Sequence, residues 1–491
     1  MNRIHRILGV FCICIISFFL AAVLAPSSLL GDQSQKTGSS ALDLPVPFYH
    51  TYNLTSLFPV GLSGAEAHQS DVAGHGSVMT LDACIDAALA QNPNFNKSRE
   101  NLRAAMGDIL MAWGNYIPTL RASYGMSQNN RTSSYVDPSG VLRTAGGISK
   151  SSYGSLSMNL TIFNAAHHYF EMKNAHFFRH ERQYQLSSAE LLLVDQVRRA
   201  YFAALRQQQQ LLAAENRAES LRDQLRLAEA KFSVGSVTKL DVLQAQVDLK
   251  DQELVIIENE NALKNAKIEL NRLMGTELER DFDLVDEFTI KKVELDQERL
   301  VKEAIENHPE VSALRYQIKQ RKNDLWMGRL AYLPTVSTSL RYDRSEDGLE
   351  FFPNLNKGRG LSFNISWNIW DSFSRFRQNR YTEIQLNNLQ YELAAKQLDI
   401  ESQVRQYYLD LLRLHQRNLA LRENRTLRQQ SLELEQERYR LGAASILELR
   451  QAQVDFAQSE IDYINSIYDF HSTLSSLSRS IGRDLARELG M

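Results

Sequence analysis

The sequence contains few of the residue types that define several classes of protein. Its 491 residues include 3 cysteines, 10 prolines and 23 glycines. Cys12 and Cys14 lie in an apolar N-terminal segment, so Cys84 alone remains beyond it. A single thiol can form neither an intrachain disulfide nor a multi-cysteine metal site. The 55 Lys+Arg nearly balance the 58 Asp+Glu, and without a basic excess we expect no nucleic-acid partner.

Motifs for catalysis and cofactor binding are also missing. The sequence has no phosphate-binding glycine loop and no nucleophile elbow. Four histidines cluster in one stretch, His167, His168, His176 and His180. No Glu follows His176 as the zinc-binding helix motif requires, so we interpret these histidines as interfacial side chains. We expect no enzyme activity, no metal and no cofactor.

Long apolar runs are confined to the N-terminus. Basic residues at Arg3 and Arg6 precede an apolar run over residues 7–24, which small residues follow. This order predicts a secretory signal peptide over residues 1–25. A membrane anchor is the alternative, because about 18 apolar residues approach the length that spans a bilayer. Residues 26–79 are rich in Ser, Gly and Pro, and we expect a loosely ordered extension there.

The remainder of the sequence is internally duplicated. The matching pairs are Asn92 with His308, Pro118 with Pro334, Tyr201 with Tyr408, Gly235 with Gly442, and Gly275 with Gly482. A period of about 210 residues is far too long for a solenoid repeat and indicates two copies of a domain-sized module. We assign residues 80–275 to the first copy and 299–485 to the second. Residues 276–298 form a linker between them, and residues 486–491 form a C-terminal tail.

Each copy is predicted to contain a helix, a pair of strands, a long helix and one further helix. The first helix covers residues 80–115, beginning at Thr80 as N-cap and ending before a Tyr-x-Pro motif. Long stretches without proline follow, each interrupted by one glycine, Gly235 or Gly442, which we interpret as a turn between helices. At 1.5 Å per residue, a helix over residues 165–233 is about 100 Å long. Such helices are longer than a globular domain needs.

The helices after the two glycines carry apolar residues at seven-residue spacing. In the first copy Val247, Leu254 and Ile268 form a series on a face of their own, beside a second series that includes Leu249. Heptad spacing predicts supercoiled packing. Two series suit a helix with neighbours on both flanks, as in a tube of helices. An ordinary antiparallel bundle is the alternative.

Four segments of about ten residues alternate between polar and apolar residues, which is typical of strands. We expect strand pairs over residues 119–163 and 335–370. The clearest segment places Leu361, Phe363, Ile365, Trp367 and Ile369 on one face. Ten residues is the length of a tilted transmembrane strand, and aromatic residues gather at the segment ends as in outer-membrane barrels. The apolar faces are therefore predicted to contact lipid. A soluble hairpin that covers a protein core is the alternative.

Four strands are too few to close a barrel, and a bilayer does not tolerate an open sheet edge. Several chains must then share one barrel, and three chains give twelve strands. The expected fold class is a mixed α and β membrane protein, in which a trimeric twelve-strand transmembrane β-barrel is continued by a long α-helical barrel.

Two stretches of the sequence resemble the TolC family of outer-membrane efflux proteins. They run from Lys231 to Ala245 and from Arg438 to Ala452, within a resemblance that covers roughly residues 80–485. The resemblance implies a homotrimer in the outer membrane, with its helical part in the periplasm. It also implies docking through a periplasmic adaptor (membrane fusion protein) to an inner-membrane RND or ABC transporter.

The function that this resemblance implies is passive transport. The chain would be a subunit of the exit duct of a tripartite efflux pump or type I secretion system, carrying small molecules or proteins out of the periplasm. A soluble periplasmic helical scaffold or adaptor protein is the alternative function. The turns at Gly235 and Gly442 would lie at the periplasmic entrance, where the adaptor docks.

The resemblance also assigns residues to a gate at that entrance. Asp241 and Glu448 match acidic positions, Tyr439 matches a tyrosine in the closing contacts, and Gln451 stands where the family has a constriction acid. Ala444 replaces an arginine of the closing salt bridge. Three copies of Glu448 would form an acidic ring that favours cations and raises the pKa of the group. The alternative is that Asp241 and Glu448 only cap helix starts.

Overall fold

The computed structural model describes residues 78–485 except 287, 289, 291–294 and 347–355. The predicted signal peptide, the tail and nearly all of the N-terminal extension therefore lie outside the described residues. The described chain forms two compact units. Residues 119–158 and 339–362 form a sheet unit, and the rest forms a helical unit.

The two copies have the same order of elements. The first contains β1 (Val78–Met79), α2 (Leu81–Gln91), α3 (Pro93–Gly114), β2 (Thr119–Val136), β3 (Leu142–Asn164), α4 (His167–Ser233) and α5 (Lys239–Met274). The second contains β4 (Asp283–Leu284), α6 (Gln297–Asn307), α7 (Pro309–Leu330), β5 (Thr335–Glu346), β6 (Asn356–Ser366), α8 (Ser374–Arg440) and α9 (Ile446–Ile481). Each helix of the first copy has the length of its counterpart, namely 11, 22, 67 and 36 residues. The predicted duplication is confirmed.

The single helix predicted over residues 80–115 is wrong, because two helices, α2 and α3, occupy this segment. Asn92 separates them with an extended backbone, since a residue before proline is pushed out of the helical region. Its side-chain Oδ1 accepts hydrogen bonds from the backbone N–H groups of Asn94 and Phe95, at 2.9 and 3.1 Å, and so caps α3. His308 separates α6 from α7 in the same way.

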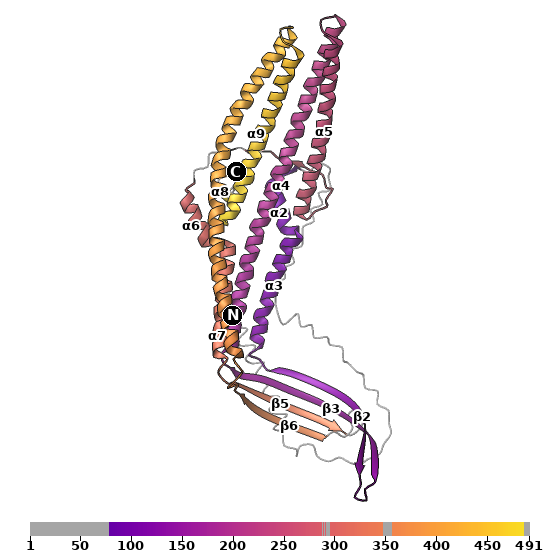
Figure 1. The fold of residues 1–491 in the computed structure, drawn as a ribbon, viewed down its shortest axis with the longest axis vertical. Helices are drawn as coiled ribbons and strands as arrows, with labels where there is room; N and C mark the ends of the chain where they lie inside the picture. The colour runs from indigo at the N-terminus through magenta and orange to yellow at the C-terminus, as the bar shows by residue number, and fades with distance from the viewer. Residues whose placement is uncertain (1–77, 287, 289, 291–294, 347–355, 486–491) are drawn as a thin grey trace, which may run out of the picture. The chain divides into compact units, whose positions relative to one another are not determined.

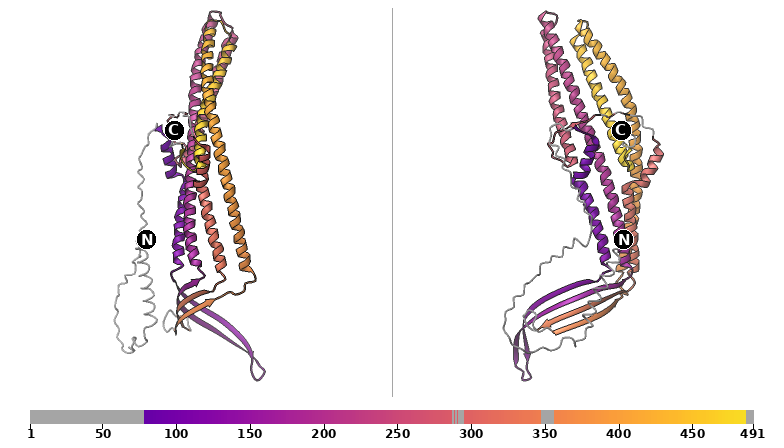
Figure 2. Two further views of the ribbon diagram at one scale, coloured as in Figure 1. Left: turned by 90° about the vertical axis from the view of Figure 1, so that its left-hand side faces the viewer. Right: turned by 180° about the vertical axis from the view of Figure 1, so that it is seen from behind.

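The helical unit is a wall of four columns (Figures 1 and 2). The 67-residue helices α4 and α8 are two of the columns, each about 100 Å long. Helices α3 and α5 follow one another along α4, and α7 and α9 follow one another along α8. Because α4 also contacts α7 and α9, the column order is α3/α5, α4, α7/α9 and α8. The outer columns of the wall are α3/α5 and α8.

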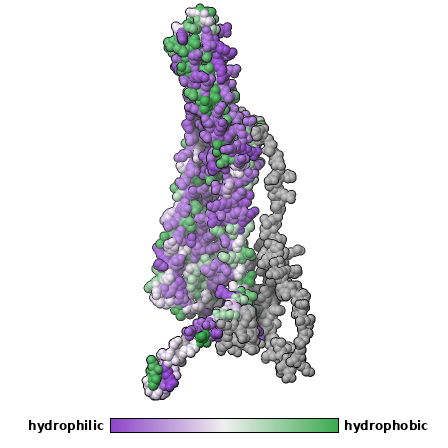
Figure 3. Space-filling model, turned by 90° about the vertical axis from the view of Figure 1, so that its right-hand side faces the viewer, coloured by the Kyte–Doolittle hydropathy of each residue, from purple (hydrophilic) through white to green (hydrophobic). Residues whose placement is uncertain are grey.

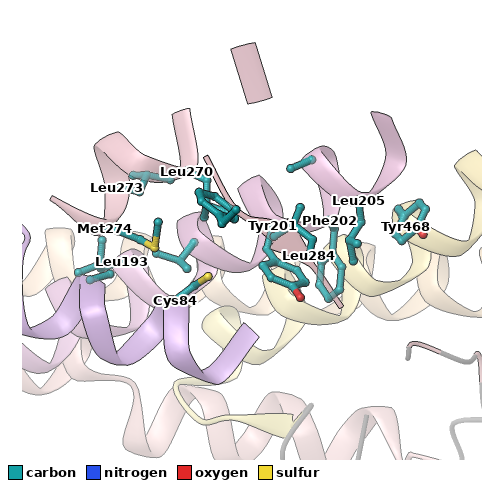
Figure 4. Close-up of a cluster of buried hydrophobic side chains, with 14 of the residues drawn as sticks. Cys84, Leu193, Tyr201, Phe202, Leu205, Leu270, Leu273, Met274, Leu284 and Tyr468 are labelled. Atoms are coloured by element: carbon teal, nitrogen blue, oxygen red, sulfur yellow. The ribbon is translucent and has the colours of Figure 1, made fainter. Parts of the chain in front are cut away.

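Each copy has its own apolar core at corresponding positions. In the first core Cys84, Leu270 and Met274 are fully buried around Tyr201, as Figure 4 shows. The second core buries their counterparts, Leu300, Leu477 and Ile481, among the side chains between α6, α8 and α9. Burial of such side chains contributes roughly 1.5–3 kcal/mol each.

A tyrosine in each long helix forms hydrogen bonds to backbone carbonyl groups of the segments that pack beside the cores. The Tyr201 hydroxyl is 3.1 Å from the carbonyl oxygen of Met79 and 2.9 Å from that of Val285. In the second copy, Tyr408 donates to the carbonyl oxygen of Leu295 at 3.0 Å. β1 pairs in parallel with β4, with Val78 opposite Asp283. The described end of the N-terminal extension is therefore an ordered strand.

The sheet has the strand order β2-β3-β5-β6. Hydroxyl pairs set the register of the first hairpin, because Ser123 lies 2.7 Å from Ser155 and Ser127 lies 2.8 Å from Ser151. Alternate residues share a face, so Leu120, Ala122, Tyr124 and Met126 lie on the same face as Leu156, Met158, Leu160 and Ile162. The alternation found in the sequence therefore produces one apolar face for each hairpin.

Both hairpins differ from their predictions. In the first, β2 and β3 have 18 and 23 residues instead of about ten, and the second differs at one end. β6 ends at Ser366, so the strand pair predicted over residues 335–370 is too long. Leu361, Phe363 and Ile365 lie within β6, whereas Trp367 and Ile369 follow it. The Trp367 indole Nε1–H donates to the Tyr332 carbonyl oxygen at 2.9 Å, which holds this segment outside the ladder.

Candidate functional site

The candidate entrance is built from two helical hairpin tips. At the first tip, Gly235 has φ +74°, and its N–H donates to the Phe232 carbonyl oxygen at 2.9 Å. Ser236 N–H donates to the Lys231 carbonyl oxygen, also at 2.9 Å. This left-handed turn satisfies the carbonyl groups that the end of a helix leaves free, and glycine adopts it without steric cost. The predicted turn at Gly235 is confirmed.

The second tip repeats this geometry. Gly442 has φ +79°, and its N–H donates to the Tyr439 carbonyl oxygen at 3.1 Å. Ala443 N–H donates to the Arg438 carbonyl oxygen at 2.8 Å. Ala444, which stands where the family arginine was expected, follows directly and is half-buried.

Both acidic gate candidates begin helices. Asp241 Oδ2 accepts from the backbone N–H of Thr238 at 2.8 Å and from its hydroxyl at 2.9 Å. Glu448 Oε2 accepts in the same way from Ser445, at 2.8 and 3.2 Å. Each pair is a complete capping box. In a single chain the hydrogen bonds from Ser445 lower the pKa of Glu448. The capping alternative therefore describes what both carboxylates do within one chain.

Tyr439 connects the two tips within the chain. Lys231 Nζ donates to its carbonyl oxygen at 2.6 Å and lies 4.3 Å from the centroid of its ring. Tyr439 is only 4% exposed, and burial, followed by the charge of Asp241, raises the pKa of its phenol. Lys231 was noted in the sequence only as part of a motif. Its contact across the two hairpins depends on the tertiary fold.

Gln451 is exposed on α9, where its Nε2 donates to Asp455 Oδ1 at 2.8 Å. Asp455 also forms an ion pair with Arg428 at 2.5 Å. The acidic group in this turn of α9 is therefore Asp455, which sequence reasoning missed. Its position one helical turn after Gln451 is the signal that could have found it.

Polar contacts join the two hairpins along the α4–α9 seam. The pairs that cross it include Gln224 with Gln453 at 2.6 Å, Gln210 with Asn465 at 3.0 Å, and Arg206 with Asp469 at 2.6 Å. Near the tips a groove of about 350 Å³ runs between α4 and α8, and Asp223, Glu433 and Glu437 lie among its lining residues. The two hairpins of one chain are therefore joined by polar contacts as well as by apolar packing.

Apolar side chains are exposed at the tips and on the outer columns. Phe232, Val234, Leu240, Leu441 and Leu447 are exposed at the tips, and Figure 3 shows hydrophobic atoms gathered around the end of the helical unit. On α5 the series Val247, Leu254 and Ile268 is exposed. On α8 the exposed series is Ile384, Tyr391, Leu398, Leu412 and Leu419. Within the chain, one of the two heptad series of α5 is thus left uncovered.

The apolar face of β6 is also uncovered. Phe363 is 68% exposed and Ile365 is 71% exposed, and Leu361, Trp367 and Ile369 are exposed too. A soluble hairpin would bury such side chains against a protein core, so these exposures count against that alternative.

No helix in the described part of the chain combines the length and the apolar character that a membrane span requires. Within residues 78–485, outside the gaps, no group of His, Cys, Asp or Glu side chains is arranged to hold a metal ion. The clustered histidines have other contacts. His167 and His168 each lie 3.3 Å from Glu171, and His180 stacks on Tyr316 at 5.1 Å.

Comparisons with known proteins agree with this geometry. A family model described as outer membrane efflux protein matches residues 84–276 and 300–483. The chain belongs to the outer membrane efflux protein family, which confirms the predicted resemblance. Membership places it in the outer membrane, with its helical part in the periplasm.

Three individual proteins illustrate the likeness. The outer membrane efflux protein BepC of Brucella suis is 21% identical over 426 residues, covering 84% of this chain and 87% of BepC. The alkaline protease secretion protein AprF of Pseudomonas aeruginosa is 24% identical over 232 residues, covering 46% of this chain and 48% of AprF. The crystal structure of the Campylobacter jejuni CmeC outer membrane channel superposes with a TM-score of 0.71 at 14% identity, covering 84% of this chain and 88% of CmeC.

Proposed function

We propose that three copies of this chain form the exit duct of a tripartite efflux pump or a type I secretion system. The observation that carries the proposal is the pair of exposed apolar series on the two outer columns of the helical wall, α5 and α8. A wall whose two outer columns carry different apolar series can join to further copies, with α5 of one copy against α8 of the next. Such a head-to-tail contact forms a closed ring when the rotation between neighbouring copies divides a full turn.

Three copies would bring twelve columns and twelve strands into one assembly. The α5 series of one copy would then pack on the α8 series of the next, which gives the exposed heptads the partners that supercoiled packing needs. The edge strands β2 and β6 would pair between copies, because an open sheet edge is not tolerated in a bilayer. The face with Leu361, Phe363 and Ile365 would contact lipid.

The gate would lie at the tips. Three symmetry-related Glu448 carboxylates around one axis would favour cations, with Asp241, Tyr439 and Gln451 forming the rest of the constriction. The hydrogen bonds from Ser445 lower the pKa of Glu448 within one chain, which opposes the upward shift that the like charges of the ring would cause. The contact between Lys231 and Tyr439 would hold the two hairpins of each chain together at the narrow end.

The partners would be a periplasmic adaptor and an inner-membrane RND or ABC transporter. The exposed Val234 and Leu441, beside Gly235 and Gly442, offer the adaptor an apolar docking surface at both tips. Transport through the duct would be passive. The names of BepC and AprF refer to efflux and to protease secretion respectively, so the cargo would be either small molecules or proteins.

The assembly is tested by placing a charge in the α5 series. We expect Leu254→Asp to convert the detergent-purified trimer into monomers, because three carboxylates would be buried at the three interfaces. Gln246→Asp, an exposed position of the same helix outside the series, is the matched control and should remain trimeric. The measurement is molar mass by light scattering. A Leu254→Asp protein with the mass of the wild type, or a wild type that is monomeric without detergent, would contradict the proposal.

The gate is tested by ion selectivity in planar bilayers. Glu448→Gln should reduce the preference for cations while leaving the trimer intact, because glutamine preserves the size of the side chain and removes the ring of charge. Asp251→Asn, on the exposed surface of α5, is the charge-matched control. Unchanged selectivity in Glu448→Gln would remove Glu448 from the gate and leave the duct itself standing.

A further inference from the structure

The apolar face of the second hairpin ends at a pair of arginines. Ser339 lies 2.7 Å from Ser362, so these residues are opposite one another in the antiparallel pair. Three residues further along each strand, Tyr342 is opposite Arg359. Arg344 shares the face of Tyr342, because residues two apart point to the same side. The change from apolar to cationic residues thus falls at the end of the strands nearest the turn.

The setting of Arg344 differs from that of the arginine on the polar face. Arg341, on the polar face, forms an ion pair with Asp343 at 2.6 Å. Arg344 instead donates from Nε to the Tyr342 hydroxyl at 2.8 Å, and its guanidinium carbon lies 5.6 Å from the centroid of the Tyr342 ring. A tyrosine with an arginine over its ring is an amphipathic pair suited to the boundary between hydrocarbon and headgroups.

The first hairpin has a similar boundary. Ser127 lies opposite Ser151, so Gln128 is opposite Lys150, and Gln128 is the next residue after Met126 on the same face. Lys150 is exposed. Both hairpins therefore carry a cation on the apolar face. In the second hairpin the arginines follow its last apolar side chains, whereas in the first Lys150 lies within the longer strand β3, with the exposed Ile148 beyond it on the same face.

We propose that Arg344 and Arg359, together with Lys150, bind the phosphate groups of a phosphorylated glycolipid in the outer leaflet. The inference rests on the proposed function, because it requires the apolar faces to contact lipid. The turn end of each strand pair is remote along the chain from the periplasmic helices, which places the cations at the outer leaflet. Guanidinium groups bind phosphate through two parallel hydrogen bonds, and cations beside a membrane surface attract anionic headgroups.

The test compares lipids that differ by one phosphate. Purified, delipidated trimer is mixed with bis-phosphorylated lipid A, monophosphoryl lipid A or phosphatidylglycerol, and the retained lipid is counted by native mass spectrometry. Wild type should retain the bis-phosphorylated lipid best, and less of it as salt is raised. The double variant Arg344→Gln with Arg359→Gln should bind it about tenfold or more weakly, because two cations near the headgroups are lost. Arg341→Gln, on the polar face of the same strand, is the control and should bind as wild type does.

Two results would overturn the inference. One is equal retention of all three lipids by wild type, which indicates annular lipid without phosphate recognition. The other is a double variant that binds as Arg341→Gln does. If the double variant fails to assemble, Arg344→Gln alone serves, with an intermediate loss expected. Trimer mass and bilayer conductance are recorded for every variant, so failure of the duct is seen separately from failure of the phosphate site.

Discussion

Corresponding positions in the two copies have different surroundings. Phe202 on α4 and Leu409 on α8 are 207 residues apart and occupy the same place in the duplicated module. Phe202 is 3% exposed, while Leu409 is 58% exposed. Phe202 packs against His471 of α9, with ring centroids 5.3 Å apart, because α4 is an inner column flanked on both sides. Among the residues that the structure describes, none covers the matching face of α8, so duplication created one inner column and one edge from similar modules.

Truncating Phe202 should reduce the stability of the folded chain, whereas truncating Leu409 should reduce the stability of the trimer. Phe202→Ala should lower the free energy of unfolding by about 3–5 kcal/mol, because it leaves a cavity in a buried cluster. Leu409→Ala should leave the fold of the chain nearly unchanged and weaken the trimer instead. Thermal melting followed by circular dichroism measures the first effect, and molar mass at decreasing protein concentration measures the second. Equal losses of melting temperature without a change in mass would contradict the assignment of α8 as an edge.

The histidine beside Phe202 makes the inner seam sensitive to acid. Burial lowers the pKa of His471 to about 4, whereas an unfolded histidine titrates near 6.5. Its stabilising contribution is therefore complete above about pH 6.5 and is lost as the pH falls towards 4. The loss amounts to about 3 kcal/mol at most.

The expected result is a melting temperature that falls between pH 6.5 and 4 in wild type and falls less in His471→Phe. The counterpart of His471 in the first copy is the exposed Lys264, and Lys264→Phe serves as the control, with the wild-type dependence on pH. An acid transition of undiminished size in His471→Phe would assign the effect to other groups.

The smallest expected effect on the free energy of unfolding concerns the residue before proline in each copy. Asn92 caps α3 with two hydrogen bonds and donates from Nδ2 to the Leu273 carbonyl oxygen at 2.8 Å. Asn92→Ala should cost about 1–2 kcal/mol, the upper range for a lost N-cap. His308 caps α7 through Nδ1, which accepts from Glu310 N–H at 3.2 Å.

His308→Asn should cost less than Asn92→Ala, because asparagine can cap α7 as it caps α3. Chemical denaturation of both variants, in parallel with wild type, measures the difference. A His308→Asn protein that loses more stability than Asn92→Ala would show that the histidine ring, and not its capping nitrogen, is what the second copy requires.

Much of the fold could be predicted from local patterns. Gly235 and Gly442 end helices because a left-handed residue satisfies the last carbonyl groups, and the alternating strands put Phe363 and Ile365 on one face. The break at Asn92 was missed because Asn92 was used only as a match to His308, although Pro93, which follows it, marks a helix boundary. The end of β6 at Ser366 could not be predicted, since the alternation continues to Ile369 after the hydrogen-bonded ladder stops.

The candidate entrance was only partly predictable. The capping roles of Asp241 and Glu448 follow from their places three residues after Thr238 and Ser445. The contact of Lys231 with Tyr439 joins residues 208 apart and has no local signal. Asp455 did have a local signal, its place one helical turn after Gln451, but its ion pair with Arg428 joins two helices and has none.

The sequence by itself determined the elements of this protein, which are two copies of a module, their helices and strands, and the apolar stripes along them. These features follow from short-range rules, because capping, the restriction before proline and the periodicities of helix and strand act over a few residues. Only the tertiary structure decided which stripes are covered. The placement of α4 between two neighbours and of α8 at an edge depends on contacts between residues hundreds of positions apart, which rules that act over a few residues do not reach.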